Sequence, residues 1–148
     1  MVKKLYRKIP LKDFLSIYRQ VPRLAVDVIV TTSQGFVLTK RSIEPFKGMW
    51  HIPVGSVLFK EPLTHAINRV TTEELGIKVN VKSLLGTIEY FNDGGRHTVT
   101  VCYLVTVKSG HLRGSFQGQE FAFFKKVPQN TIPEQATFLS QHLSNCYY

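Results

Sequence analysis

One stretch of 22 residues, GSVLFKEPLTHAINRVTTEELG at positions 55–76, constrains the fold of this chain more than any other segment. Apolar residues recur in it at helical spacing and predict a helix over 62–75 with one buried face, formed by Leu63, Ala66, Ile67 and Val70. Pro62 suits the first helical position because its missing N–H would be unpaired there in any case. Gly76 supplies the stop, since glycine adopts the left-handed conformation without strain.

The acidic residues of this stretch lie at the two ends of the expected helix. Glu61 just before the helix would complement its positive end. Glu73 and Glu74 would share the last turn, where they repel each other and the negative helix end, and a hard divalent cation is the simplest group that makes such a pair favourable. The alternative is an amphipathic surface helix whose Arg69 and Glu73 form a solvated i,i+4 pair. That alternative leaves the flanking glycines and the spacing unexplained.

Size and composition indicate a single globular domain over residues 1–148, with 1–22 as an N-terminal extension. A chain of 148 residues buries roughly 70% of its unfolded surface. Its hydrophobic content of 43% and charged content of 20% are ordinary for globular domains. No apolar run approaches the ~20 residues of a membrane helix, so no membrane partner is expected.

The net charge indicates which kinds of partner the chain binds, and its cysteines indicate its cellular compartment. With 19 Lys+Arg against 10 Asp+Glu, the net charge of +9 favours anionic partners such as nucleotides, phosphosugars or nucleic acid. A basic surface that serves solubility is the alternative, and without a basic motif interleaved with aromatics nucleic acid is the less favoured partner. The N-terminus lacks the apolar core of a signal peptide. Cys102 and Cys146 form no close-spaced metal pair. These two features together indicate a reduced, cytoplasmic protein.

Hydrophobic patterning along the chain predicts an α/β fold. Helices are expected over 11–20, 62–75 and 132–143, and strands over 24–32, 36–41, 49–55, 77–91, 97–108 and 120–127. The segment 77–91 breaks its alternation near 83–86, and 109–119 is polar and glycine-rich, so it reads as a loop. This order of elements predicts a mixed β-sheet between helices on both faces.

The 55–76 stretch resembles the Nudix box, G-x5-E-x7-R-E-U-x-E-E-x-G-U, where U is apolar. Seven positions match in register: Gly55, Glu61, Arg69, Glu73, Glu74, Gly76 and Ile77. The resemblance implies a Nudix α/β/α sandwich and a hydrolase that uses Mg²⁺, with Mn²⁺ as the alternative cofactor. Val70 departs from the pattern, which has glutamate there, and in a helix it shares a face with Glu73 and Glu74.

More of the chain resembles the GDP-mannose mannosyl hydrolases, Nudix relatives that also lack this glutamate. The matching features are the short N-terminal helix, AVDVIV, the Lys-Arg pair, PFKGMWHIPVG, and the ending R-x-T-x-x-E-L-G. The resemblance implies that water attacks the sugar carbon of a nucleoside diphosphate sugar, which releases the sugar and a nucleoside diphosphate. It also implies that Gly55 (through its carbonyl), Glu74 and Gln117 hold the metal; Glu73 is a fourth candidate from its place on the helix.

The remaining candidate site residues follow from the same comparison. Arg69 and Glu120 are the catalytic candidates, Glu120 as the base, because many Nudix enzymes draw a carboxylate from this loop. Asp27, Arg41 and Tyr103 are the candidates for substrate binding. Asp27 is a charge within an apolar strand, so it is either a buried site residue or an outward-facing one. For Tyr103 a packed aromatic is the favoured reading.

Two further departures keep other functions open. Ser56 stands where the mannosyl hydrolases have an arginine, and Gly118 stands where they have a histidine base. The first alternative is a Nudix pyrophosphatase that attacks phosphorus in nucleoside diphosphate derivatives. The second, motivated by Val70, Ser56, Gly118 and the charge, is a module that binds nucleotides or RNA without catalysis. The resembling enzymes are dimers, which makes residues 1–22 a candidate dimer interface.

Overall fold

The computed structural model describes residues 6–116, 118 and 120–143. Three helices and seven strands lie within these residues: α1 (Leu11–Ile17), β1 (Arg23–Thr32), β2 (Gly35–Lys40), β3 (Trp50–His51), β4 (Val54–Ser56), α2 (Leu63–Leu75), β5 (Ile77–Asp93), β6 (Arg96–Gly110), β7 (Glu120–Phe124) and α3 (Pro133–Leu143). Over the described ranges, no helix is both long and apolar enough to cross a membrane.

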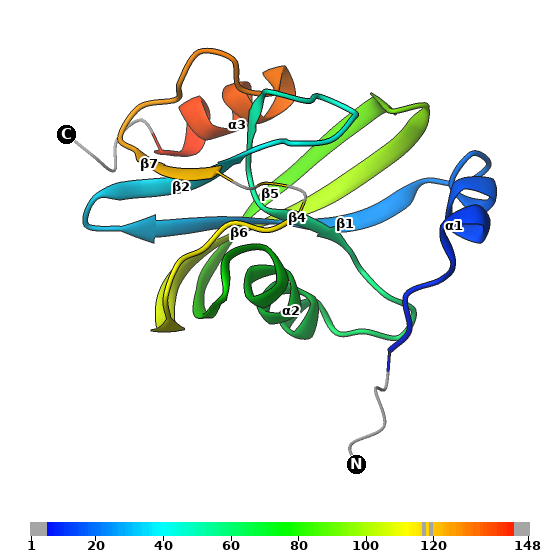
Figure 1. The fold of residues 1–148 in the computed structure, drawn as a ribbon, viewed down its shortest axis with the longest axis horizontal. Coiled ribbons are helices and arrows are strands. Elements are labelled where there is room, and N and C mark those ends of the chain that lie inside the picture. The colour runs from blue at the N-terminus through cyan, green and yellow to red at the C-terminus, as the bar shows by residue number, and fades with distance from the viewer. Residues whose placement is uncertain (1–5, 117, 119, 144–148) are drawn as a thin grey trace.

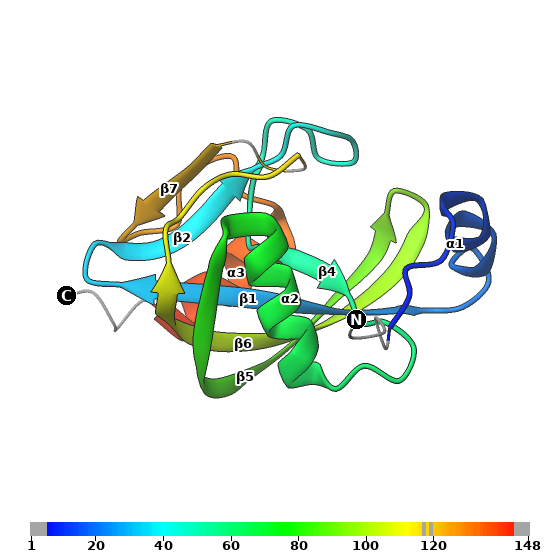
Figure 2. The same ribbon diagram turned by 60° about the horizontal axis from the view of Figure 1, so that its bottom comes forward.

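The strands form one mixed sheet that lies between two helices. Its order is β3-β2-β1-β6-β5, and β4 and β7 pair with β1 and β2. β1 and β6 run parallel, while the other pairs are antiparallel. α2 and α3 cover opposite faces of the sheet, and α1 lies beyond its end (Figure 1, Figure 2). The predicted α/β/α sandwich with a mixed sheet is therefore confirmed.

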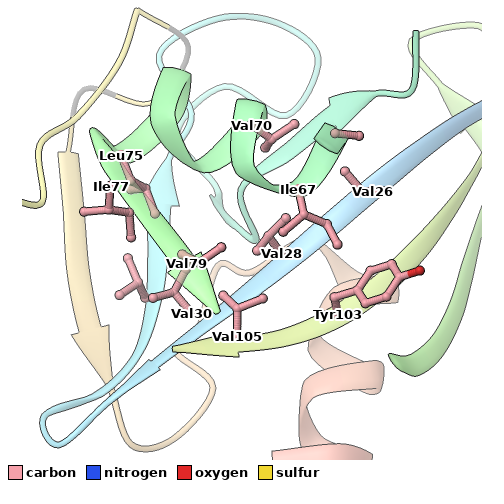
Figure 3. Packing of buried hydrophobic residues seen from close by; sticks show 12 residues of the cluster. Val26, Val28, Val30, Ile67, Val70, Leu75, Ile77, Val79, Tyr103 and Val105 are labelled. Carbon is pink, nitrogen blue, oxygen red and sulfur yellow. The ribbon is translucent and has the colours of Figure 1, made fainter. Parts of the chain in front are cut away.

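The central strand β1 supplies both halves of the core, because side chains alternate between the faces of a sheet. Val26, Val28 and Val30 pack beneath α2 in a cluster with Ile67 (Figure 3). Ile29 packs with the other cluster, which includes Leu139 of α3. A strand covered on both faces reads as a continuous apolar run, which explains the sequence of this segment.

The boundaries of the helix before Gly76 differ slightly from the prediction. Pro62 precedes the helix instead of opening it: its ψ of 146° is extended, and its carbonyl accepts the Ala66 N–H at 3.0 Å. Gly76 ends the helix in the left-handed conformation with φ 71°, as its sequence position predicts. α1 also ends earlier than predicted, at Ile17.

The strand β5 explains the broken alternation in its sequence. It runs without interruption from Ile77 to Asp93, with irregular register against β6 at Val81/Ser83 and Leu84/Gly86. A β-bulge places an extra residue on one strand and shifts the alternation after it. The break near 83–86 is therefore a pair of bulges within one strand.

Gly55 brings β4 unusually close to α2. A Cβ on Gly55 would lie 2.5 Å from Cγ2 of Val70, which is itself 1% exposed. The need for glycine here comes from this close approach, since a side chain at 55 would displace the helix. Val70 thus fills with an apolar side chain the place where the Nudix pattern has a carboxylate.

We expect Gly55→Ala to lower the free energy of unfolding by about 1–3 kcal/mol, because the added methyl overpacks this contact. In Gly55→Ala/Val70→Ala the loss should be smaller than the sum of the two single losses, since the shorter side chain makes room. Urea denaturation of the four proteins measures both quantities. Strictly additive losses would contradict the contact as the cause.

Candidate active site

A cavity of about 900 Å³ lies where α1, β4, α2 and the β5–β6 hairpin meet. Its volume is within the range of small-molecule sites. The charged side chains that line it come from segments that are far apart in the sequence: Arg7, Lys8, Arg23, Arg41, Glu44, Arg69, Glu73, Glu74, Asp93 and Arg96. The fold therefore assembles a charged cavity beside the end of α2 that carries the paired carboxylates.

Arg69 ties α2 to the loop that precedes it. Its Nε and Nη2 donate to the two carboxylate oxygens of Glu61 at 2.8 and 2.9 Å, and Nη2 also donates to the carbonyl of Ser56 at 2.7 Å. Burial alone would raise the pKa of Glu61, but the hydrogen bonds from Arg69 and the Leu58 N–H outweigh it and leave that pKa below its usual value. These bonds fix the end of β4 against the helix.

The two adjacent carboxylates have different surroundings. Glu74 is 9% exposed, and its Oε2 accepts the Ser115 hydroxyl at 2.7 Å. Burial raises the pKa of Glu74; the Ser115 hydrogen bond opposes this, and the charge of Glu73 adds to it. Glu73 is partly exposed and pairs with Lys8 at 3.0 Å and with Arg69 at 3.4 Å. A cation near Glu74 would relieve the cost of its burial.

The oxygen donors at this edge fit a hard cation whose remaining ligands would come from a bound phosphate. Over the described residues, no three His, Cys, Asp or Glu side chains converge on one point. Glu73 and Glu74 are two oxygen donors, and Gly55 contacts Val70 one turn before Glu74. Mg²⁺ is commonly bound by one or two carboxylates plus substrate phosphates. Gln117, the other predicted ligand, lies outside the described residues.

Arg41 is a half-buried cation that lacks a carboxylate partner in the described part of the chain. Its Nε donates to the carbonyl of Pro45 at 2.6 Å. Burial lowers the pKa of Arg41; the charges of Asp93 and Glu74 oppose this, and nearby arginines add to it. A half-buried guanidinium needs an anion, and its planar fork matches phosphate.

Asp27 lies buried behind the cavity wall. Its Oδ2 accepts the hydroxyls of Thr100 at 2.7 Å and Tyr90 at 3.1 Å, and both of these residues line the cavity. Its Oδ1 has no hydrogen-bond partner among the described residues. Burial raises the pKa of Asp27 to about 6, although the hydrogen bonds and Arg23 oppose the shift. Asp27 thus acts on the cavity through the two hydroxyls that it orients.

Of the eight predicted site residues that lie within the described ranges, five line the cavity, Asp27 lies behind its wall, and two lie elsewhere. Those that line it are Arg41, Gly55, Arg69, Glu73 and Glu74. Tyr103 packs in the core cluster beneath α2 (Figure 3). Glu120 is exposed at the start of β7, opposite Lys40 of β2.

His51 is a buried cavity residue that the sequence analysis passed over. Its Nδ1 pairs with the carbonyl of Ile52 at 2.8 Å, which makes Nδ1 the protonated nitrogen and Nε2 the acceptor for the Thr39 hydroxyl at 2.8 Å. Burial, with a smaller contribution from Arg41, lowers the pKa of His51 to about 4, so the ring is neutral at pH 7. A Cβ on Gly118 would lie 2.8 Å from Cβ of Thr39, so glycine admits this pair.

Comparison with known proteins gives consistent matches over most of the chain. Residues 21–144 match the family model described as NUDIX domain. The low-salt glycan biosynthesis protein Agl8 of Haloferax volcanii is 33% identical over 139 residues, which cover 89% of each protein. The ADP-ribose pyrophosphatase of Methanocaldococcus jannaschii is 33% identical over 135 residues, which cover 90% of this chain and 77% of that protein. A MutT NUDIX hydrolase from Burkholderia pseudomallei has a similar crystal structure, with a TM-score of 0.75 at 28% identity over 82% of this chain and 98% of that one.

The raised pKa of Asp27 predicts a pH-dependent stability. The folded protein holds the Asp27 proton up to about pH 6, whereas the unfolded chain releases it near 3.8. The free energy of unfolding should therefore fall by about 3 kcal/mol as the pH rises through this window. Asp27→Asn should remove this fall and be more stable than the wild type at pH 7. Urea denaturation from pH 4 to 7 measures it, with the exposed Asp13→Asn as control; parallel profiles for the wild type and Asp27→Asn would contradict it.

Proposed function

The chain belongs to the NUDIX domain family, and we propose that it is a Mg²⁺-dependent hydrolase of a nucleoside diphosphate sugar, acting in the cytoplasm. One observation carries the proposal: a single cavity holds Glu73 and Glu74 on one wall and the half-buried Arg41, free of a carboxylate partner among the described residues, on another. A diphosphate could bind Arg41 directly and bind Glu73 and Glu74 through a shared cation.

The bond cleaved is proposed to be the one between the sugar carbon and the diphosphate. The supporting features are the resemblance to GDP-mannose mannosyl hydrolases and the apolar Val70, which packs on Gly55 where most Nudix boxes carry a carboxylate. The haloarchaeal relative named for glycan biosynthesis favours a sugar nucleotide as the substrate class. GDP-mannose is accordingly the first substrate to test.

In this mechanism the residues of the chain bind and orient the diphosphate. Arg41, which directly follows β2, would donate to its oxygens. Arg69 acts indirectly, because its bonds to Glu61 and to the Ser56 carbonyl set the position of β4. When bound at Glu73, Glu74 and the Gly55 carbonyl, Mg²⁺ would supply positive charge to the departing diphosphate.

For the proton acceptor we propose Glu120, the carboxylate closest in sequence to Gly118. It is exposed at the start of β7, two residues after Gly118, where its carboxylate could accept a proton from water. His51 is the weaker choice, since its low pKa makes it a poor base.

A pyrophosphatase is the second candidate, because a relative of 33% identity is named ADP-ribose pyrophosphatase. Water would then attack phosphorus, and a nucleoside monophosphate would be released. The same cavity and the same metal would serve both reactions, so the products distinguish them.

We expect the wild type to release free mannose and GDP when it is incubated with GDP-mannose and Mg²⁺. The products are separated by anion-exchange chromatography, and UDP-glucose, ADP-glucose and ADP-ribose are assayed in parallel. GMP or AMP in place of the diphosphate would support the pyrophosphatase. If no substrate yields a sugar or a nucleotide product, the enzymatic proposal is wrong and a binding module remains.

We expect Glu74→Gln to remove Mg²⁺ binding and to lower kcat by at least about a hundredfold, because it removes a metal ligand. Without metal the variant should be no less stable than the wild type, since Glu74 carries its charge at a cost. Calorimetry with MgCl₂ measures the first effect and a substrate assay the second. The exposed Glu134→Gln serves as the matched control. Unchanged Mg²⁺ affinity in Glu74→Gln would refute this assignment.

A further inference from the structure

Arg23, at the start of β1, is a cavity cation with no role in the function proposed above. Each of its nitrogen atoms is held by a side chain: Nη1 donates to Ser56 Oγ at 2.8 Å, Nε to Thr98 Oγ1 at 3.1 Å, and Nη2 to Asp93 Oδ2 at 3.0 Å. The side chain of Arg23 is 13% exposed. The guanidinium is thus fixed in one orientation before any ligand binds, which lowers the entropy cost of binding.

Arg23 keeps donors for a further partner. A guanidinium carries five N–H groups, and the three bonds within the described residues leave one on each terminal nitrogen. Oxygens of one phosphate group can accept from two such donors at once, which is the bidentate geometry that arginine favours.

The charges around Arg23 leave an excess of positive charge in this part of the cavity. Asp93 lies 3.0 Å from Arg23 and 3.8 Å from Arg96, so one carboxylate is shared between two guanidinium groups. Both guanidinium groups also lie over the ring of Phe14 in α1, with their central carbon atoms 6.0 and 5.7 Å from its centre. The charge of Arg23 reaches Arg41 as well. An anion with two or more charges would neutralise the three arginines.

Ser56 places Arg23 beside the candidate metal site. Arg23 holds the hydroxyl of Ser56, and Arg69 holds its carbonyl. The preceding residue is Gly55, whose carbonyl is the candidate metal ligand. The guanidinium of Arg23 is therefore bonded to the residue that directly follows the proposed metal ligand.

We propose that Arg23 binds the diphosphate of the substrate directly, next to the metal, as the partner of Arg41. The inference rests on the proposed function. Position 56 is where the mannosyl hydrolases that this chain resembles carry an arginine. Here the guanidinium reaches the same place from β1, and the serine at 56 becomes its hydrogen-bond partner.

A transposition of the arginine tests this directly. Nucleoside diphosphate binding is measured by calorimetry in excess Mg²⁺, with whichever of ADP, GDP, UDP and CDP the wild type binds most tightly. Arg23→Ser should weaken this binding about tenfold or more, because it removes charge-assisted hydrogen bonds. Arg23→Ser/Ser56→Arg should recover most of the lost affinity, since the guanidinium returns from the other strand. Arg113→Ser, which removes a cation outside the cavity, should bind like the wild type.

Each result decides the inference. Wild-type affinity in a folded Arg23→Ser overturns it, and so does a folded double variant that recovers nothing, because the loss would then come through Asp93. If Arg23→Ser does not fold, Arg23→Lys replaces it; that variant keeps the charge without the fork, and full affinity in it overturns the direct contact. A wild type that binds no nucleoside diphosphate also overturns it.

The same experiments separate this inference from the function it rests on. A wild type that binds the nucleoside diphosphate through Arg23 but hydrolyses no substrate refutes the hydrolase and leaves the Arg23 contact standing. A wild type that hydrolyses its substrate while Arg23→Ser matches it in both affinity and kcat refutes the contact and leaves the hydrolase standing.

Discussion

The ion pair between Arg69 and Glu61 is the constraint on which the candidate site depends. Its two hydrogen bonds of 2.8 and 2.9 Å join α2 to the loop that leads into it, and a third bond carries the carbonyl of Ser56 along. The position of Ser56 in turn sets two further contacts, that of Gly55 with Val70 and that of Arg23 with the Ser56 hydroxyl. A buried pair of this kind adds less to stability than to geometry, because desolvation offsets much of its attraction.

The cavity brings together charges of both signs, namely the carboxylates of α2 and the half-buried Arg41. Glu74 is buried near a second carboxylate at the negative end of a helix, and Arg41 is half-buried near other arginines. Neither arrangement is favourable for the empty protein. Under the proposed function, both would become favourable together when a cation and a polyanion bind.

The order of elements and the capped helix could be predicted from the sequence because both depend on local chemistry, as Gly76 shows. The neighbours across the sheet could not. Tyr103 was a candidate for substrate binding, although a packed aromatic was the favoured reading; the register pairs Cys102 with Asp27 and Tyr103 with Val28, which turns its ring into the core beneath α2. Arg23 was overlooked because its partners Ser56, Asp93 and Thr98 are 33, 70 and 75 residues away. Strand register decides both which face of the sheet a side chain points to and which distant residues it meets.

The N-terminal segment before residue 21 lies outside the matched family domain, yet Lys8 and Phe14 belong to the wall of the cavity. This segment therefore closes one side of the cavity. Because Lys8 pairs with Glu73 of α2, an exchange of the segment would also change the surroundings of the carboxylates. A protein trimmed to residues 21–144 would lack this side of the cavity together with the Lys8 partner of Glu73.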